Sequence, residues 1–154
     1  MKFLIIQTRN FGELNIEETR IITFAEGLIG FPNHKKFVLI DSSDSPNNYF
    51  HWLQSVDDGE MAFLLMNVNG IFPDYEPDID DSDIESICLN DKDIEICLIY
   101  NVAVIPADDL DNMRVNLKAP VIVNTISMKG KQVLAEEDYD VKHNILKELI
   151  NKKN

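Results

Sequence analysis

The chain has 154 residues, a length that fits one domain large enough to bury a hydrophobic core. Its 27 Asp and Glu residues outnumber its 14 Lys and Arg residues, and the formal net charge of -13 argues against direct binding to nucleic acid or to an anionic membrane surface. An acidic surface suits a basic protein partner, because complementary charge speeds encounter and rejects wrong partners. The alternative is that most of these acids only keep the protein soluble.

Short apolar runs separated by turn residues fill the first half of the chain, and this pattern predicts strands. A polar loop at 41–48 separates two of the runs, and Asp-Asp-Gly-Glu at 57–60 has the composition of a hairpin turn between two others. The strands predicted in this half are 3–8, 12–16, 20–24, 37–40, 49–54 and 62–68.

An acidic segment interrupts the strand pattern in the middle of the chain. Residues 74–85 include seven Asp and Glu residues in twelve positions, and Pro77 rules out a central strand there. Asp80 and the polar residues after it supply N-cap groups for a short helix that runs to about residue 90. Helical spacing gives this helix one buried stripe, formed by Ile84, Ile87 and Cys88.

The strongest strand pattern spans 94–105, where the run 96–100 is apolar without alternation and predicts burial on both faces. Further strands are predicted at 113–117, 119–124 and 131–135, with a hairpin turn at 128–131. Apolar residues at helical spacing over 139–153 predict a terminal amphipathic helix. No repeat or linker divides the chain, so we expect one mainly β domain in which 139–154 is a helical tail.

The N-terminal apolar run is only four residues long and no small-residue cleavage site follows it, so it does not resemble a signal peptide. No apolar stretch approaches the ~20 residues needed to cross a bilayer. Two cysteines, Cys88 and Cys97, are too few to staple a domain of this size and lack zinc-site spacing. We therefore expect a cytoplasmic protein with reduced thiols.

Motifs that carry common catalytic or metal chemistry are missing from the sequence. A calcium-loop alignment that starts at Asp78 places Asp83 where the turn demands Gly and Leu89 where a bidentate Glu is needed. Gly27 and Gly30 lack the third glycine of a dinucleotide-binding loop. The sequence thus predicts no catalytic residue, no metal and no cofactor; a hydrolase that uses carboxylates is the weakest alternative.

Three motifs stand out along the chain: Gly-Leu-Ile-Gly-Phe-Pro at 27–32, Leu-Gln-Ser at 53–55 and Asn-Leu-Lys-Ala-Pro at 116–120. In their order and spacing, these motifs resemble those of the flagellar assembly factor FliW family, and the resemblance covers roughly residues 2 to 140. Their side chains have structural interpretations, since glycine permits positive φ and Pro cannot donate to a ladder. We expect mainly structural roles for Gly27, Gly30, Phe31, Pro32, Gln54, Asn116, Lys118 and Pro120, with Phe31 closing one end of the core.

The resemblance implies a small antiparallel, barrel-like β fold over 1–138. It also implies a factor that binds flagellin and the translational regulator CsrA, so that export of flagellin frees the factor to capture CsrA. Separately, we expect the protein alone to be a monomer. A basic RNA-binding regulator agrees with the acidic composition. The partner-binding residues expected from the acidic segments and their exposed apolar neighbours are Ile71, Phe72, Asp74, Tyr75, Glu76, Asp78, Asp80, Asp81, Asp108 and Asp109.

Two other interpretations stay open at this point. The acids can be a solvated loop without a partner. The fold can also be a barrel that binds a small ligand in a cavity beneath the 27–32 turn, in which case polar groups must converge on an empty interior.

Overall fold

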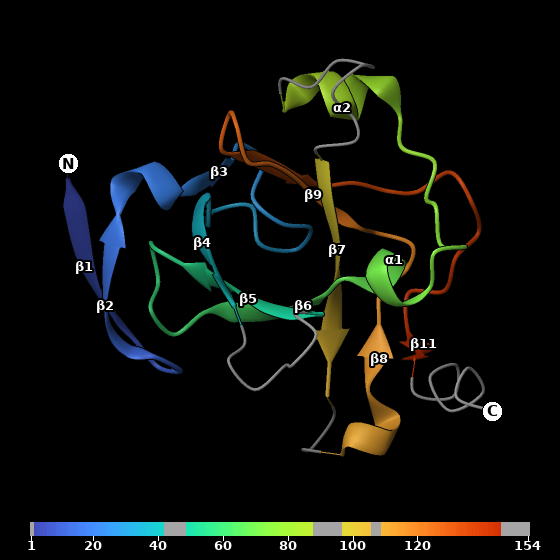
Figure 1. Cartoon of the computed structure of the whole chain (residues 1–154), viewed down its shortest axis with the longest axis horizontal. Helices are drawn as coiled ribbons and strands as arrows, with labels where there is room; N and C mark the ends of the chain where they lie inside the picture. Colours follow the sequence, from blue (N-terminus) through green and yellow to red (C-terminus); the bar gives the residue numbers. More distant parts are fainter. Residues whose placement is uncertain (1, 42–48, 88–96, 106–108, 146–154) are drawn as a thin grey trace.

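A computed structural model describes residues 2–41, 49–87, 97–105 and 109–145. Its centre is a closed barrel of seven strands (Figure 1). Around the barrel the order is β7-β6-β5-β4-β3-β10-β9, and pairing of β9 with β7 closes the ring. All neighbours are antiparallel except β3 and β10, which are parallel. The barrel strands are β3 (Ile22–Phe24), β4 (Lys36–Asp41), β5 (Phe50–Ser55), β6 (Ala62–Met66), β7 (Cys97–Val104), β9 (Val121–Asn124) and β10 (Lys129–Gln132).

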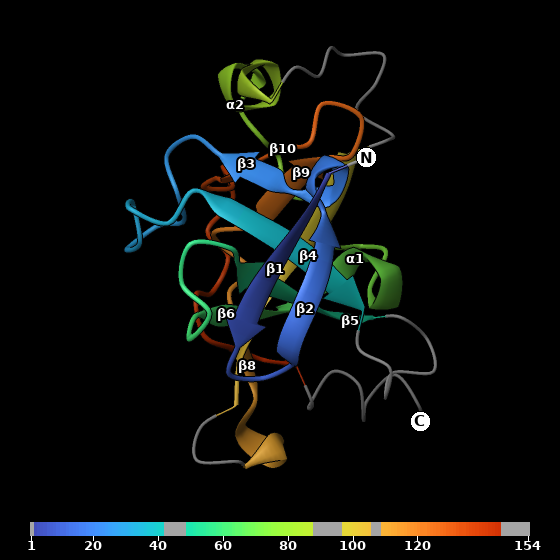
Figure 2. The same ribbon diagram turned by 90° about the vertical axis from the view of Figure 1, so that its left-hand side faces the viewer.

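Two strand pairs lie outside the ring. Strands β1 (Phe3–Thr8) and β2 (Gly12–Glu17) form a separate hairpin, which stands against one side of the barrel in Figure 2. Strand β8 (Arg114–Val115) pairs with the end of β7, and β11 (His143–Asn144) pairs with β8. The described chain therefore confirms the mainly β, barrel-like prediction.

The barrel interior is filled by side chains. Phe24, Phe37, Leu53 and Leu65 are fully buried there, and the rings of Phe24 and Phe37 meet edge to face at 5.3 Å. Strands rich in β-branched and aromatic residues supply this core because each pleat places alternate side chains inward. A filled interior counts against the interpretation of the fold as a ligand-binding barrel.

In the described part of the chain, four short helical segments connect the strands: the 3₁₀ turns η1 (Glu18–Arg20) and η4 (Leu110–Asn112), and the helices α1 (Val68–Ile71) and α2 (Asp81–Ser86). Helix α2 confirms the helix predicted after the acidic loop, and the Asp80 carboxylate caps it by accepting from the Ser82 N–H. Ile84 and Ile87 of its predicted stripe are buried. Cys88 and the predicted end near 90 lie outside the described residues. None of the described helices is long and apolar enough to span a membrane.

Several predicted elements differ from the structure in extent. The expected turn at 128–131 is wrong, because β10 starts at Lys129 and the turn ends on Met128, whose φ is 56°. Strand β7 is buried on both faces at the adjacent residues Tyr100 and Asn101, but within the predicted run 96–100 Leu98 is 37% exposed. Residues 94–96 of that predicted strand, the loop 42–48 and residue 108 lie outside the described ranges.

The tail differs from the prediction at its beginning. A helix was expected from residue 139, yet β11 lies at 143–144 and the buried side chain of Ile145 packs in the core. Backbone pairing with β8 takes precedence here over the local helical spacing, because β8 offers an unpaired edge. Residues 146–154, which hold most of the predicted helix, lie outside the described part.

The motif side chains tie neighbouring segments together. The fully buried Gln54 donates its amide N–H groups to the carbonyls of Ser55 and Met61, both at 3.0 Å, and so fixes the β5–β6 connection. Asn116 accepts from the Ala119 N–H at 3.0 Å, and the Pro120 carbonyl accepts from Val133 N–H. Phe31 does not close the core as expected. It is 39% exposed, and its ring packs edge to face on Phe63 with 5.1 Å between the ring centroids.

Candidate partner-binding groove

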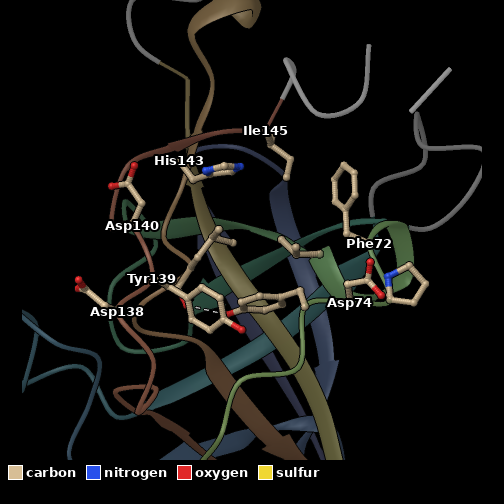
Figure 3. Close-up of a pocket in the computed structure, with 11 residues that line it drawn as sticks. Phe72, Asp74, Asp138, Tyr139, Asp140, His143 and Ile145 are labelled. Carbon is tan, nitrogen blue, oxygen red and sulfur yellow. Dashed lines mark hydrogen bonds between the residues drawn. The ribbon is translucent and has the colours of Figure 1, made fainter. Parts of the chain in front are cut away.

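An acidic groove of about 700 Å³ opens beside α1 and β11. Its floor is apolar, and Phe72 and Asp74 lie on the side opposite Asp138 and Asp140, with Tyr139 between them (Figure 3). We call this feature the acidic groove; its described lining residues are Val68, Phe72, Pro73, Asp74, Tyr75, Leu117, Asp138, Tyr139, Asp140, His143 and Ile145.

One wall of the acidic groove is formed by residues 72–75, which come directly after α1 in the chain. The Asn67 side chain caps the start of this helix by accepting from the Gly70 N–H at 3.0 Å. At the other end of the helix, the Phe72 N–H donates to the Val68 carbonyl. The Tyr75 N–H then bonds the Phe72 carbonyl at 2.9 Å, which turns the chain across the groove. The local sequence thus presents Phe72 as a half-buried apolar wall with Asp74 exposed at its edge.

The two acidic walls are bound to each other although they are about sixty residues apart in sequence. The Asp78 N–H donates to both carboxylate oxygens of Glu137, at 2.9 and 3.1 Å, and the Asp78 carbonyl accepts from the Glu136 N–H. This backbone donor lowers the pKa of the Glu137 carboxyl, because it stabilises the charged form. The backbone of the second wall is held by Lys118, whose Nζ donates to the carbonyls of Ala135 and Glu137 at 2.6 and 2.7 Å.

Tyr75 anchors the floor of the acidic groove. Its hydroxyl donates to the Leu117 carbonyl at 2.6 Å and accepts from Asn101 Nδ2 at 2.9 Å, and its ring meets Tyr139 at 5.0 Å. Burial raises the pKa of Tyr75 to about 12, while the bond from Asn101 acts in the opposite direction. Burial also raises the pKa of Tyr139, and the nearby Glu137 carboxylate adds to the rise.

The rim of the groove carries uncompensated negative charge. Asp74, Asp138 and Asp140 are exposed, and none of them forms an ion pair with a cation of the described residues. An apolar floor with an acidic rim is suited to an apolar segment flanked by Lys or Arg, since apolar burial supplies affinity and charge supplies orientation and speed.

The structure divides the residues that the sequence predicted for partner binding. Phe72, Asp74 and Tyr75 come together in the acidic groove, but Ile71 and Tyr75 are only 7% and 6% exposed, contrary to their expected exposure. Other expected residues lie outside the groove. Glu76 is exposed beside it, Asp78 and Asp81 line a different hollow next to α2, Asp80 caps α2, Asp109 caps η4, and Asp108 is outside the described residues.

Sequence reasoning missed the second wall at 138–145. The sequence predicts a helical tail from residue 139, and neither Asp138 nor Asp140 is among the predicted partner-binding residues. One signal was available: Asp-Tyr-Asp at 138–140 repeats the acid and aromatic composition of 74–76. Nothing in the sequence, however, reported that the two segments pair.

Removal of the Tyr75 hydroxyl tests whether this buried group contributes to the pH dependence of stability. Because the pKa of Tyr75 is about 12 in the folded chain and near 10 in the unfolded chain, the hydroxyl contributes stability that is present below pH 10 and lost as the pH rises to 12. We expect Tyr75→Phe to remove this part of the alkaline loss, at most about 2 kcal/mol. Urea unfolding of both proteins at pH 8, 10 and 11 measures it; identical slopes against pH contradict the assignment.

Comparisons with known proteins show the family of the chain. A sequence model of the FliW protein family matches residues 5–145. The chain belongs to the FliW family. Among FliW relatives, a flagellar assembly factor from Alkaliphilus metalliredigens is 35% identical over 148 residues, covering 95% of this chain and 88% of the relative. Another, from Caldicellulosiruptor saccharolyticus, is 41% identical and covers 87% of this chain and 84% of the relative.

The fold agrees with a solved FliW structure. A crystal structure of the flagellar assembly factor FliW superposes with a TM-score of 0.80 at 30% identity, covering 92% of this chain and 96% of that one. The FliW names describe an assembly factor and no enzymatic activity. Within the described ranges, no three His, Cys, Asp or Glu side chains are grouped so that they could hold a metal ion.

Proposed function

We propose that this chain acts in flagellar assembly as a cytoplasmic protein-binding factor with two alternative partners, flagellin and the translational regulator CsrA. While flagellin is abundant it occupies the factor. When flagellin is exported, the freed factor captures CsrA and relieves repression of flagellin synthesis. Competition for one limiting protein couples translation to export by mass action.

The acidic groove is the observation that carries this proposal. Its apolar lining, which includes Phe72 and Tyr139, offers area for a partner's side chains, and its exposed aspartates complement a basic protein such as an RNA-binding regulator. The filled barrel supports a binding role that uses the outer surface rather than the interior.

Calorimetric titration of the purified protein with flagellin and, separately, with CsrA from the same organism tests the two partners. Saturable heat with each partner supports the proposal, and a third titration with the preformed flagellin complex then tests competition. Binding to flagellin alone leaves a chaperone without the translational switch. If neither titration gives a heat of binding and all proteins are folded, the proposal is overturned.

Charge reversal at the groove rim is expected to slow capture of a basic partner. We expect Asp74→Lys combined with Asp138→Lys to reduce the association rate with CsrA about tenfold at low salt, since opposite charge steers encounter. The deficit should shrink toward physiological salt because ions screen exposed charges. Stopped-flow fluorescence at several salt concentrations measures this rate.

The matched control keeps the same change in net charge but places it away from the groove, at Glu18→Lys and Glu60→Lys. Both residues are exposed and lie in the N-terminal hairpin region and the β5–β6 connection. If both double variants slow association equally, only the overall charge matters and the groove has no special role.

A further inference from the structure

A second hollow of about 380 Å³ lies on the other side of segment 138–145 from the acidic groove. Val141 and Lys142 line this hollow, whereas Asp138, Tyr139, Asp140 and His143 line the groove. The same separation occurs on β8 and the residues after it, where Asn116 faces the hollow and Leu117 the groove. The two depressions are therefore neighbours with separate walls.

The hollow gathers exposed apolar side chains. Leu28 forms a buried part of its wall, and Phe31 rests on Phe63 at its edge. Ten large apolar side chains of the described residues are exposed, and four of them line this one depression: Ile29, Phe31, Val104 and Val141, with exposures of 56%, 39%, 58% and 53%. Single exposed apolar residues are ordinary on a protein surface, but a cluster around a depression marks an interaction site.

The charge of this rim is opposite to that of the groove. Arg114 and Lys142 line the hollow, and neither forms an ion pair with a carboxylate of the described residues. One guanidinium N–H of Arg114 contacts the Met113 carbonyl at 3.4 Å. In contrast, Lys131 on the same barrel pairs with both Glu26 and Asp83. In a chain with a net charge of -13, two uncompensated cations beside one apolar depression form a local site for carboxylates.

The polar groups among the lining residues hold the wall in place. Gln132 Oε1 accepts from the Ile29 N–H at 2.9 Å, and its Nε2 donates to the Ala119 carbonyl at 3.1 Å. Asn116 is engaged with Ala119 through its Oδ1. These bonds preorganise the loop that carries Ile29 and leave recognition to the apolar surface and the two cations.

We propose that this cationic hollow is a second docking surface, which binds an apolar peptide segment carrying Asp or Glu from a partner protein. A second copy of this chain is a poorer occupant, because two molecules of net charge -13 repel each other. The inference does not depend on flagellin or CsrA as partners, and its surface differs from the acidic groove.

Selection of a random peptide library displayed on phage against the full chain tests the proposal. We expect the enriched peptides to combine apolar residues with Asp or Glu. We also expect them to bind the double variant Arg114→Glu with Lys142→Glu at least about tenfold more weakly than they bind the parent protein. The control is Lys2→Glu, Arg9→Glu, which makes the same change in net charge at exposed positions of the N-terminal hairpin and should leave binding unchanged. Fluorescence anisotropy of the synthesised peptides measures the affinities.

A second double variant distinguishes loss of binding from misfolding. The double variant Ile29→Ser with Val104→Ser removes exposed apolar surface and leaves both cations in place. We expect it to lower the affinity for the peptides several-fold, while its circular dichroism spectrum stays that of the parent. Enriched peptides without acids, equal binding to parent and hollow variants, or no enrichment at all would each overturn the proposal. So would sedimentation showing a parent dimer that the Arg114→Glu, Lys142→Glu variant cannot form, because the occupant is then a second copy.

Discussion

Replacement of Gly27 by Ala is expected to destabilise the protein by about 3 kcal/mol, roughly a 6–12 °C fall in Tm. Gly27 has a φ of +67°, which an L side chain adopts at a cost. In addition, a Cβ there would lie 2.8 Å from Pro32 Cα and closer still to the Phe31 carbonyl oxygen. Both neighbours are backbone atoms, so no side-chain rotation relieves the contact. Thermal unfolding followed by circular dichroism measures the change.

Gly30 provides a matched control in the same loop. Its φ of +90° also favours glycine, but a Cβ at this position meets no atom within 4 Å. We therefore expect Gly30→Ala to cost only about 1 kcal/mol, the backbone part of the effect. Equal losses for the two variants would show that φ alone, rather than the close approach of Gly27 to residues 31 and 32, sets the requirement for glycine.

Replacement of Lys118 by Met is expected to destabilise the chain by about 3 kcal/mol and to weaken binding in the acidic groove. The ammonium group makes two charge-assisted bonds, to the carbonyls of Ala135 and Glu137, and Met leaves both carbonyls without this donor. Glu137 in turn holds Asp78, so the loss loosens the contact between the two walls. Urea unfolding measures stability, and titration with CsrA, the proposed partner, measures binding.

Lys2→Met is the control for this variant, because Lys2 is exposed on the N-terminal hairpin and its loss removes the same charge. We expect it to change stability by no more than about 0.5 kcal/mol. If Lys118→Met lowers stability but leaves groove binding unchanged at a temperature where the protein is folded, Lys118 supports the fold alone and the wall need not be fixed for recognition.

Local chemistry in the sequence was enough to predict most elements. The strand at 3–8 has the predicted bounds, the turn at 57–60 lies between β5 and β6, and Asp80 caps α2 as expected. These features depend on residues close in sequence, whose side-chain period and capping groups are visible without the fold. Helix α1 was missed because it has only four residues and overlaps the end of a β-like apolar run.

The sequence predicted partner-binding residues but no groove. Of those residues, Phe72, Asp74 and Tyr75 line one side of the acidic groove. Burial of Ile71 and Tyr75 was not predicted, because it depends on contacts with Leu117, Asn101 and the segment after residue 135. Such contacts join residues tens of positions apart, and no periodicity records them.

By itself the sequence determined the mainly β composition, the acidic character and the family motifs, since each of these is a property of residues near one another in the chain. Only the tertiary structure decided that β9 closes the barrel on β7, that the walls at 72–78 and 136–140 meet, and that Arg114 joins Lys142 beside exposed apolar residues. The physical reason is that a strand's apolar face specifies burial but not its partner. The pairing is chosen by the packing of the whole core, which depends on every strand at once.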